Sequence, residues 1–211
     1  MPKDTSPDQC IALEYLERLY GRAASDGFIS TWTRQSNQIE WFSIGDLNRL
    51  CDFMLHEASR SDIYHSWCIQ KNPLGPSRRG GSDTVVESPG VFFDADLKSD
   101  VHSKTALPES YGHVIDWLQT EEIPRPSQIR HSGNGLYLDW LHPEPVFLES
   151  EPARAEYARQ VRAFHVALRK NARRSRGWDF DSTPDLARVT RMPGTFNHKT
   201  EPAKPVELIH D

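Results

Sequence analysis

The residues Val91-Phe92-Phe93-Asp94-Ala95-Asp96-Leu97 are the most informative segment of the chain, because an apolar run leads there into two acidic side chains. An apolar run of this kind predicts a buried strand. Side chains alternate between the faces of a strand, so Asp94 and Asp96 project to the same side. Adjacent carboxylates repel one another unless a cation bridges them, and Mg²⁺ and Mn²⁺ prefer oxygen ligands. Acidic pairs of this spacing also occur by chance, so a metal site needs support from other residues.

The composition is that of a folded domain without an overall attraction to polyanions. With 211 residues the chain can form one sizeable core or two small lobes. Hydrophobic residues make up 37%, below the usual share of about 45–50%, but six Trp, nine Phe and six Tyr supply apolar area for a packed interior. The formal net charge is −5, so any nucleic acid must be bound by local basic clusters.

The cysteines and the N-terminus indicate the cellular compartment. Cys10, Cys51 and Cys68 are far apart and show no zinc-ligand spacing, which favours a reducing compartment over a disulfide framework. The residues after Met1 lack the apolar run of a signal peptide, and no stretch reaches the roughly 20 apolar residues that span a bilayer. We therefore expect a soluble cytoplasmic protein with no membrane partner.

The residues before the acidic strand predict two helices and a hairpin. Ser6-Pro7-Asp8-Gln9 has the form of a capping box that starts a helix, and Gly21 is a natural end for that helix. The elements expected after it are a hairpin of Phe28–Arg34 and Ile39–Phe42, a helix whose apolar side runs from Leu47 to Ala58, a strand over Tyr64–Ile69 and a polar loop over Lys71–Ser88.

The residues after the acidic strand continue the alternation without an internal repeat. The expected elements are a helix at about Glu109–Thr120, a hairpin over Gln128–Leu141 folded about Asn134-Gly135, a long helix at about Glu151–Asn171 that buries Tyr157, Val161, Phe164 and Leu168, a strand over Leu186–Arg191, a turn at Pro193-Gly194 and a last strand near Val206–Ile209. This order predicts a mixed α+β domain of two small layers. Because no helix follows the last strand, we expect the chain to be part of a longer protein.

The glycine-rich turn His131-Ser132-Gly133-Asn134-Gly135-Leu136-Tyr137 is a second candidate for the site. Glycines expose backbone N–H groups that can bind phosphate, although an ordinary hairpin turn explains them equally well. The hairpin register places a cation, a hydroxyl, a phenol and a carboxylate on one face, namely Arg130, Ser132, Tyr137 and Asp139. Such a set is unusual in a core and is typical of a binding site.

Two basic segments lie near the C-terminus. The segment Asp185–Lys199 carries Arg188 and Arg191 on a β-prone stretch, where they suit a polyphosphate or a primer backbone, or else form an exposed strand with charged partners. The run Arg169–Arg176 has five cations in eight residues. It is typical of a solvated helix end, and in a template-using enzyme it would contact the DNA backbone.

Taken together, the acidic strand, the Ser-Gly-x-Gly turn and the later Asp…Arg-x-x-Arg-x-Pro-Gly-Thr-x-Asn-x-Lys segment resemble the archaeo-eukaryotic primase superfamily, and within it the phage and plasmid primase-polymerase branch. The likeness extends from about Phe28 to the C-terminus. It implies one primase-polymerase domain over residues 1–211, with an N-terminal α/β part to about residue 90 and an RRM-like catalytic part over about 91–211. It also implies a bacterial cell or phage-infected host as the location.

The resemblance implies a role for each matching residue. Two Mg²⁺ or Mn²⁺ ions are held by Asp94, Asp96 and a later aspartate, with Asp181 narrowly preferred over Asp179. The residues implied or expected to bind the nucleotide are Arg130, Ser132, Gly133, Asn134, Gly135, Tyr137, Arg188, Arg191, Asn197 and Lys199. The residues expected to contact DNA are Arg78, Arg79, Arg169, Lys170, Arg173, Arg174 and Arg176. The implied partners are a single-stranded DNA template, nucleoside triphosphates and a helicase domain or subunit.

One position departs from the family pattern. Tyr137 stands where the family has a histidine that contacts the triphosphate, and a phenol carries no positive charge at neutral pH. We expect Arg130 or the Arg78-Arg79 loop to replace that charge. The alternatives are a catalytically inactive, DNA-binding primase-like module and a Mn²⁺-dependent glycosyltransferase that uses the acidic pair to hold a nucleotide sugar.

Overall fold

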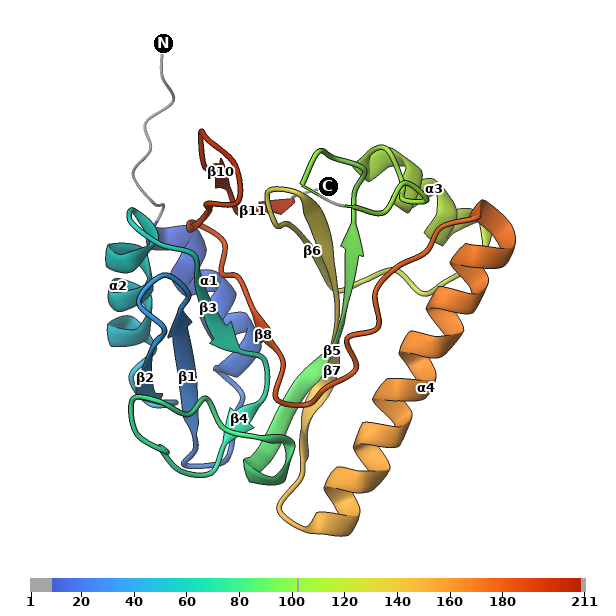
Figure 1. Cartoon of the computed structure of the whole chain (residues 1–211). Coiled ribbons are helices and arrows are strands. Elements are labelled where there is room, and N and C mark those ends of the chain that lie inside the picture. The colour runs from blue at the N-terminus through green and yellow to red at the C-terminus, as the bar shows by residue number, and fades with distance from the viewer. Residues whose placement is uncertain (1–8, 102, 210–211) are drawn as a thin grey trace.

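The computed structural model describes residues 9–101 and 103–209, which form two lobes joined by one sheet (Figure 1). The capping box predicted at Ser6-Pro7-Asp8 lies outside these residues. The four helices are α1 (Gln9–Tyr20), α2 (Leu47–Ala58), α3 (Tyr111–Thr120) and α4 (Glu151–Arg176), and a short 3₁₀ turn spans Ser82–Thr84. Within the described part of the chain, no helix is both long enough and apolar enough to cross a membrane.

The strands form one antiparallel nine-stranded sheet and a separate pair. The sheet has the order β11-β6-β7-β5-β4-β1-β3-β8, with β2 attached to β1, and β9 pairs with β10. The strands are β1 (Phe28–Thr33), β2 (Gln38–Ser43), β3 (Ile63–Ser66), β4 (Ile69–Gln70), β5 (Val85–Asp96), β6 (Gln128–His131), β7 (Gly135–Phe147), β8 (Val189–Thr190), β9 (Phe196–Asn197), β10 (Lys204–Pro205) and β11 (Glu207–Ile209).

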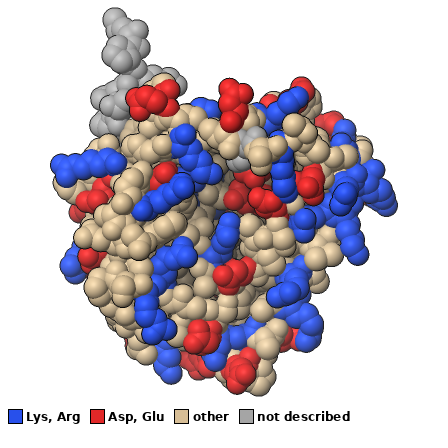
Figure 2. Space-filling model, in the orientation of Figure 1, with Lys and Arg blue, Asp and Glu red and all other residues tan. Residues whose placement is uncertain are grey.

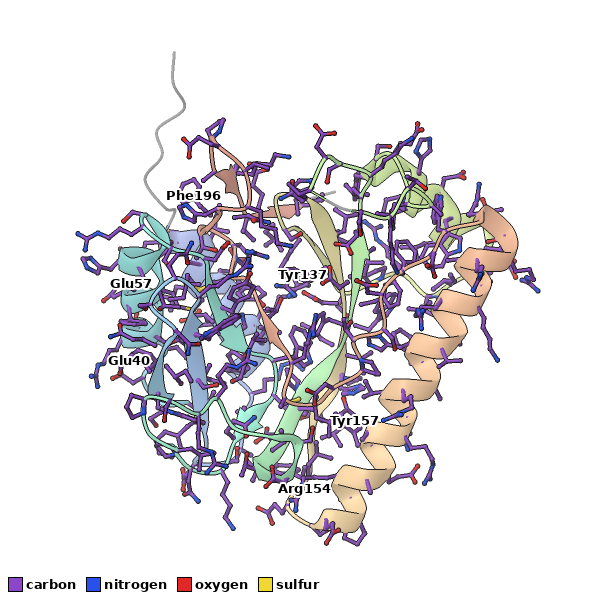
Figure 3. The ribbon with its side chains drawn as sticks, in the orientation of Figure 1. Glu40, Glu57, Tyr137, Arg154, Tyr157 and Phe196 are labelled. Atoms are coloured by element: carbon purple, nitrogen blue, oxygen red, sulfur yellow. The ribbon has the colours of Figure 1, made fainter. Side chains whose placement is uncertain are left out.

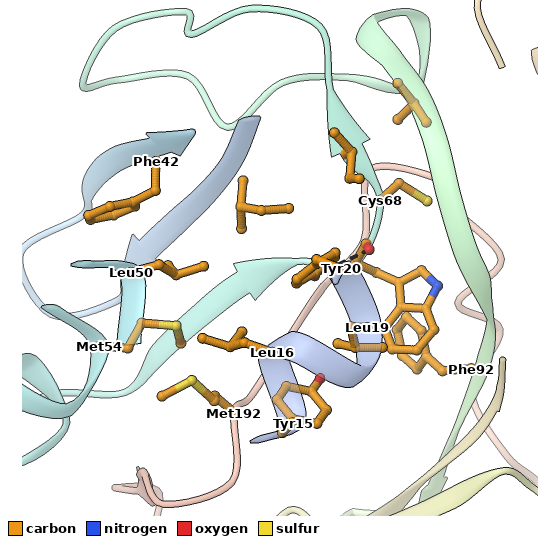
Figure 4. Close-up of a cluster of buried hydrophobic side chains, with 14 of the residues drawn as sticks. Tyr15, Leu16, Leu19, Tyr20, Phe42, Leu50, Met54, Cys68, Phe92 and Met192 are labelled. Atoms are coloured by element: carbon orange, nitrogen blue, oxygen red, sulfur yellow. Dashed lines mark hydrogen bonds between the residues drawn. The ribbon is translucent and has the colours of Figure 1, made fainter. Parts of the chain in front are cut away.

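The N-terminal lobe packs α1 and α2 against one face of the β1–β2–β3 strands. Leu16 of α1 and Leu50 and Met54 of α2 are fully buried against Ile29 and Ile63 of these strands (Figure 4). The helices form because their apolar residues recur at helical spacing, and Asp46 caps α2 by accepting a hydrogen bond from the Arg49 backbone N–H.

The second lobe packs α3 and α4 against the face of β5 and β7 that carries Phe93, Ala95 and Leu136. These side chains share a core with Trp117 of α3 and Leu168 of α4. Because neighbouring residues on a strand point to opposite faces, this packing turns Asp94 and Asp96 away from the helices and toward the N-terminal lobe. The long helix ends at Gly177, which adopts the left-handed conformation that terminates helices.

The two lobes share the sheet, so the α+β architecture is confirmed as one continuous structure. The expected division at residue 90 falls inside β5, which pairs with β4 of the first lobe and with β7 of the second. After α4 the chain returns to the first lobe, where β8 pairs with β3. This return brings residues 188–199 between the lobes.

The predicted helices and both hairpins are confirmed, and the differences concern boundaries. The strand expected over Tyr64–Ile69 is interrupted at Trp67-Cys68, because β3 and β4 pair with opposite ends of β1. The loop expected to reach Ser88 ends earlier, since β5 starts at Val85. The long helix extends to Arg176. Its buried side includes His165, whereas Phe164 is only partly buried.

The last predicted strands are shorter than expected. Only Val189–Thr190 of the Leu186–Arg191 stretch pairs with a neighbouring strand, and the final strand begins at Glu207. The short pair β9–β10 was not predicted from the sequence. A two-residue strand is held by its neighbours and leaves no periodic pattern of its own.

Candidate active site

Asp94 and Asp96 lie at the end of β5, on the face that looks toward the N-terminal lobe. Both side chains are partly buried, and the β5–β7 register places Asp94 opposite Tyr137 and Asp96 opposite Gly135. A Cβ atom added to Gly135 would lie 3.0 Å from the Asp96 Cα and from the Ala95 carbonyl oxygen. Glycine is therefore needed at residue 135 for β7 to approach the acidic strand this closely.

The glycine-rich turn connects the acidic strand to the C-terminal segment. It is centred on Gly133-Asn134, because the Ser132 N–H donates to the Gly135 carbonyl at 2.8 Å. Gly133 has φ +89°, a conformation that favours glycine. The Gly133 N–H donates to His131 Nδ1, so the N–H groups of Ser132 and Gly133 already have acceptors in the protein. Their predicted role as phosphate donors does not fit this arrangement.

Residues on both sides of β8 bring positive charge near Asp94. Burial and then the neighbouring Asp96 carboxylate raise the pKa of Asp94 to about 7, while Arg188, Arg191 and Lys199 lower it. The last three residues were predicted from the sequence as nucleotide ligands. The structure therefore brings the acidic pair and the basic segment together, although about 90 residues separate them in the chain.

Arg191 is the most enclosed of these cations. It is 4% exposed, and its Nη2 donates to Asp62 at 2.8 Å, to the Tyr64 hydroxyl and to Asn197 at 3.3 Å. Among the described residues its Nε atom has no hydrogen-bond acceptor. A buried guanidinium nitrogen without an acceptor has lost its hydrogen bond to water and has gained none in the protein. An oxygen atom of a ligand is therefore a natural partner for it.

Asn197 holds the turn and the basic segment together. Its Nδ2 donates to the Ser132 carbonyl at 2.6 Å, while its Oδ1 accepts from Arg191 and from the Lys199 N–H. These contacts position the turn and the basic segment, and a direct contact of Asn197 with the nucleotide remains a prediction. Lys204 makes a similar contact, since its Nζ donates to Asn134 Oδ1 at 2.8 Å.

An open cleft of about 680 Å³ lies beside the cations, lined by Arg34, Gln35, Asp62, Val101, His198 and Lys199. Figure 2 shows Lys and Arg side chains on the face between the lobes, around a hollow near the middle of the view. The lining includes an exposed lysine and an exposed arginine. The cleft is therefore a suitable place for an anionic ligand.

Arg130 does not replace the charge of the missing histidine. It shares a face with Tyr137 and Asp139, as the sequence predicted, and its guanidinium lies 4.5 Å from the Tyr137 ring centroid. However, it is fully buried and makes paired hydrogen bonds of 2.7 Å to both oxygens of Asp139, which is fully buried too. Its Nη1 donates to Thr190 and to the Arg191 carbonyl. This saturated cation joins the lobes and leaves little for a phosphate.

Tyr137 lies near the centre of the molecule, between the lobes (Figure 3). It is 4% exposed, and burial, followed by Asp94, raises its pKa to about 12, so the phenol stays neutral near pH 7. In the Arg78-Arg79 loop, Arg79 lies over the Trp32 ring at 4.7 Å, and a role of this loop in replacing the missing charge remains a prediction. The positive charge beside Asp94 comes from Arg188, Arg191 and Lys199.

The third predicted metal ligand is not assembled with the acidic pair. Lys104 Nζ lies 2.7 Å from Asp181 and 3.4 Å from Asp179, and the Asp181 side chain is 62% exposed. Over residues 9–101 and 103–209, no three His, Cys, Asp or Glu side chains come close enough to form a metal site. The structure thus unites two of the three predicted carboxylates.

The basic end of α4 is only partly available to DNA. Arg174 pairs with Glu121, Arg176 pairs with Asp116, and Arg169 Nε donates to the Phe180 carbonyl at 2.7 Å. Lys170 and Arg173 are exposed, as are Arg78 and Arg79 in the loop before β5. A DNA contact by these residues remains a prediction.

Four residues at the site were not predicted from the sequence, and three of them belong to the N-terminal lobe. Asp62 and Tyr64 orient Arg191 from 129 and 127 residues away, and Arg34 and His198 line the cleft. A lone aspartate before a β-strand gives no signal of its own. Only the pairing of β8 with β3 reveals that this side chain faces the basic segment.

Solved structures are similar to this chain in fold. The AEP domain of the cyanophage S-2L primase-polymerase (PrimPol) matches with a TM-score of 0.62 and 14% identity, over 97% of this chain and 91% of that one. The primase RepB′ matches with a TM-score of 0.47 and 14% identity, over 95% of this chain and 56% of that one. No protein-family model and no curated protein sequence matches.

The first of these similarities confirms the fold expected from the family resemblance. The chain has the fold of an archaeo-eukaryotic primase domain, in which an antiparallel sheet carries α3 and α4 on the face opposite the candidate site.

Proposed function

We propose that this chain is a primase-polymerase domain that joins nucleoside triphosphates into a strand on a single-stranded DNA template. The observation that carries the proposal is the placement of Arg188, Arg191 and Lys199 around the Asp94 carboxylate. Carboxylates for cations and cations for phosphates are the two parts that nucleotidyl transfer requires at one point.

Asp94 and Asp96 fit the divalent cations implied by the fold. Their repulsion, together with burial, raises the pKa of Asp94 to about 7, and a bound cation would relieve that repulsion. When bound, Mg²⁺ or Mn²⁺ activates the attacking 3′-hydroxyl and neutralises charge on the pyrophosphate leaving group. A third ligand is available only if Asp181 or Asp179 leaves Lys104, or if the nucleotide itself supplies the remaining oxygens.

The basic segment is suited to hold the triphosphate. Arg188 is half-buried, and Lys199 is exposed on the wall of the cleft. Arg191 is fixed by Asp62 and Tyr64, which leaves its Nε for a phosphate oxygen. Cations fixed before the substrate arrives stabilise the charge that develops during transfer without further reorganisation.

Nucleotide incorporation tests the proposal directly. Wild-type protein is incubated with a single-stranded DNA template, radiolabelled nucleotides and Mn²⁺, and products are resolved by length. We expect dinucleotides and longer products from the wild type and none from Asp94→Asn. Equal product from Asp94→Asn and wild type would remove the acidic pair from the mechanism.

A second candidate function is a primase-like module that binds DNA without catalysis. Two observations favour it, namely the pairing of Asp181 with Lys104 and the neutral Tyr137 at the family's histidine position. It predicts template binding by the wild type and no metal-dependent product under any nucleotide condition. The same assay, with template binding measured in parallel, therefore separates the two candidates.

The expected setting of this activity follows from the proposal. A polymerase of this kind acts in the cytoplasm of a bacterial cell or a phage-infected host, and a helicase domain or subunit would supply the single-stranded template. Co-purification with a helicase encoded beside the chain, or fused to it, would support this setting.

A further inference from the structure

The face of the N-terminal sheet that is turned away from α1 and α2 carries two aromatic side chains. Trp32 of β1 and Tyr64 of β3 are opposite one another in the strand register. Tyr64 is buried, whereas Trp32 is partly exposed and belongs to neither core cluster. Aromatic rings on an open sheet face, outside the core, are typical of surfaces that stack nucleic acid bases.

These two rings form a chain of contacts between a surface loop and the candidate active site. Trp32 and Tyr64 are stacked with centroids 5.3 Å apart and an angle of 27° between their planes. The Arg79 guanidinium lies 4.7 Å from the Trp32 ring centroid, and the Arg191 guanidinium lies 4.4 Å from the Tyr64 centroid. Trp32 is therefore two ring contacts away from Arg191, a cation of the Asp94 site.

The loop that carries Arg79 is fixed through its backbone. The Ser30 hydroxyl donates to the Arg79 carbonyl at 2.9 Å, and Trp41 Nε1 donates to the Gly75 carbonyl at 3.0 Å. The Ile39 N–H donates to the Pro76 carbonyl at 3.2 Å. Because the backbone is fixed, the Arg79 side chain can leave the ring of Trp32 without rearranging the loop.

The charges around Trp32 suit the backbone of a nucleic acid strand. Arg34, the residue after β1, is exposed at the cleft and lies 3.8 Å from Asp62, and Arg78 and Arg79 are exposed on the loop. The Asp94 site already has three cations for a triphosphate. A further row of exposed cations beside an aromatic ring exceeds what one nucleotide needs and matches a longer polyanion.

We propose that Trp32 stacks on one base of the single-stranded DNA template, with Arg79 moving from the ring to a template phosphate. This inference rests on the proposed function, because it names where that function's template binds. Nucleic acid bases of every kind have a face that can stack, so the contact would serve many template sequences.

Fluorescence anisotropy with a labelled oligothymidylate, in metal-free buffer, tests the inference. The variants are Trp32→Leu, which removes the aromatic face, Trp32→Phe, which keeps one, and Trp41→Leu, a matched change on the same sheet face beneath the loop. Stacking on one base predicts a loss of affinity of about tenfold in Trp32→Leu, with the salt dependence unchanged. Trp32→Phe should recover most of the affinity, and Trp41→Leu should bind like the wild type.

Each of the other outcomes contradicts the stacking of Trp32 on a template base and assigns the result to a different cause. Equal binding by Trp32→Leu and wild type overturns the stacking site, and equal losses in Trp32→Leu and Trp41→Leu assign the effect to the position of the loop. A loss of affinity for a labelled nucleoside triphosphate but not for oligothymidylate assigns the ring to the incoming nucleotide. If the wild type itself binds no oligothymidylate, the proposed function fails along with the stacking site.

Discussion

Arg130 and Arg191 are both buried arginines between the two lobes, but their surroundings differ in one respect. Arg130 makes paired hydrogen bonds to Asp139 and further bonds to Thr190 and the Arg191 carbonyl. Arg191 binds Asp62 and Tyr64 and, within the described part of the chain, leaves its Nε without an acceptor. We call the region around Arg130 closed, because its buried charges are paired with one another. We call the region around Arg191, which includes Asp94 and Arg188, open, because a polar atom there lacks a partner among the described residues.

This comparison separates a structural charge from a functional one. A buried charge is tolerated when it is neutralised and hydrogen-bonded, and the Arg130–Asp139 pair meets both conditions. Asp94 and Asp96 are instead two like charges on neighbouring positions of one strand face, and burial, followed by Asp96, raises the pKa of Asp94 to about 7. A bound cation can relieve the repulsion between two such carboxylates. The open region is therefore the candidate site, and the closed region holds the lobes together.

The largest effect is expected from the open region. Asp94→Asn should reduce nucleotide incorporation at least about 1,000-fold, because the pair loses one of its two carboxylates for the cations. The metal-free variant should be at least as thermally stable as the wild type, because repulsion between Asp94 and Asp96 is removed. Incorporation assays and thermal melts check both, with the exposed Asp26→Asn as control.

Substitutions in the closed region should instead lower the free energy of unfolding. Arg130→Met leaves the Asp139 carboxylate buried without its partner, which costs about 3–5 kcal/mol in the free energy of unfolding. Urea unfolding measures the loss, and the double variant Arg130→Met/Asp139→Leu should regain most of it. A loss below about 1 kcal/mol in the single variant would show that the pair is not a closed structural unit.

His65, which also lies in the closed region, should make stability depend on pH. It accepts or donates hydrogen bonds with Tyr15 and Tyr20, and burial, followed by Arg130, lowers its pKa from 6.5 to about 3. Between these values the unfolded chain binds a proton that the folded protein does not, so stability is lost as the pH falls below 6.5. His65 by itself should contribute a loss of about 2 kcal/mol from pH 7.5 to 5, which the raised pKa of Asp94 opposes.

Urea unfolding at the two pH values measures this loss in the wild type and in His65→Gln, which stays polar but cannot take up a proton. The difference between pH 7.5 and 5 should shrink in the variant. An unchanged difference would assign the acid sensitivity to other groups.

The smallest effect is expected from a single cation of the open region. Arg188→Ala removes one charge-assisted contact to the triphosphate, which should raise KM for nucleotide about tenfold. The free energy of unfolding should change by less than about 0.5 kcal/mol, because Arg188 is only half-buried. Arg159→Ala, on the exposed side of α4, is the matched control. A fall in the free energy of unfolding without a change in KM would show that Arg188 has a structural role, like Arg130.

Local patterns in the sequence were sufficient to predict the helices, the hairpins and the acidic strand. The alternation around Asp94 and Asp96 predicted their common face, and the hairpin register predicted that Arg130, Tyr137 and Asp139 would share one. Both rules depend only on the two-residue period of a β-strand, so they need no knowledge of the rest of the fold. The basic segment was found by its arginines, which a core strand rarely carries.

The roles of these side chains depended on contacts over long sequence distances. The pairing of β8 with β3 makes Arg191 a partner of Asp62, and the Arg130–Asp139 bonds turn an expected phosphate ligand into an internal ion pair. Lys104 likewise pairs with Asp181, the residue that the family resemblance implies as the third metal ligand. Residue type and spacing show that a charge is present, but whether it is neutralised depends on which distant segment packs against it, because electrostatic interactions act through space and not along the chain.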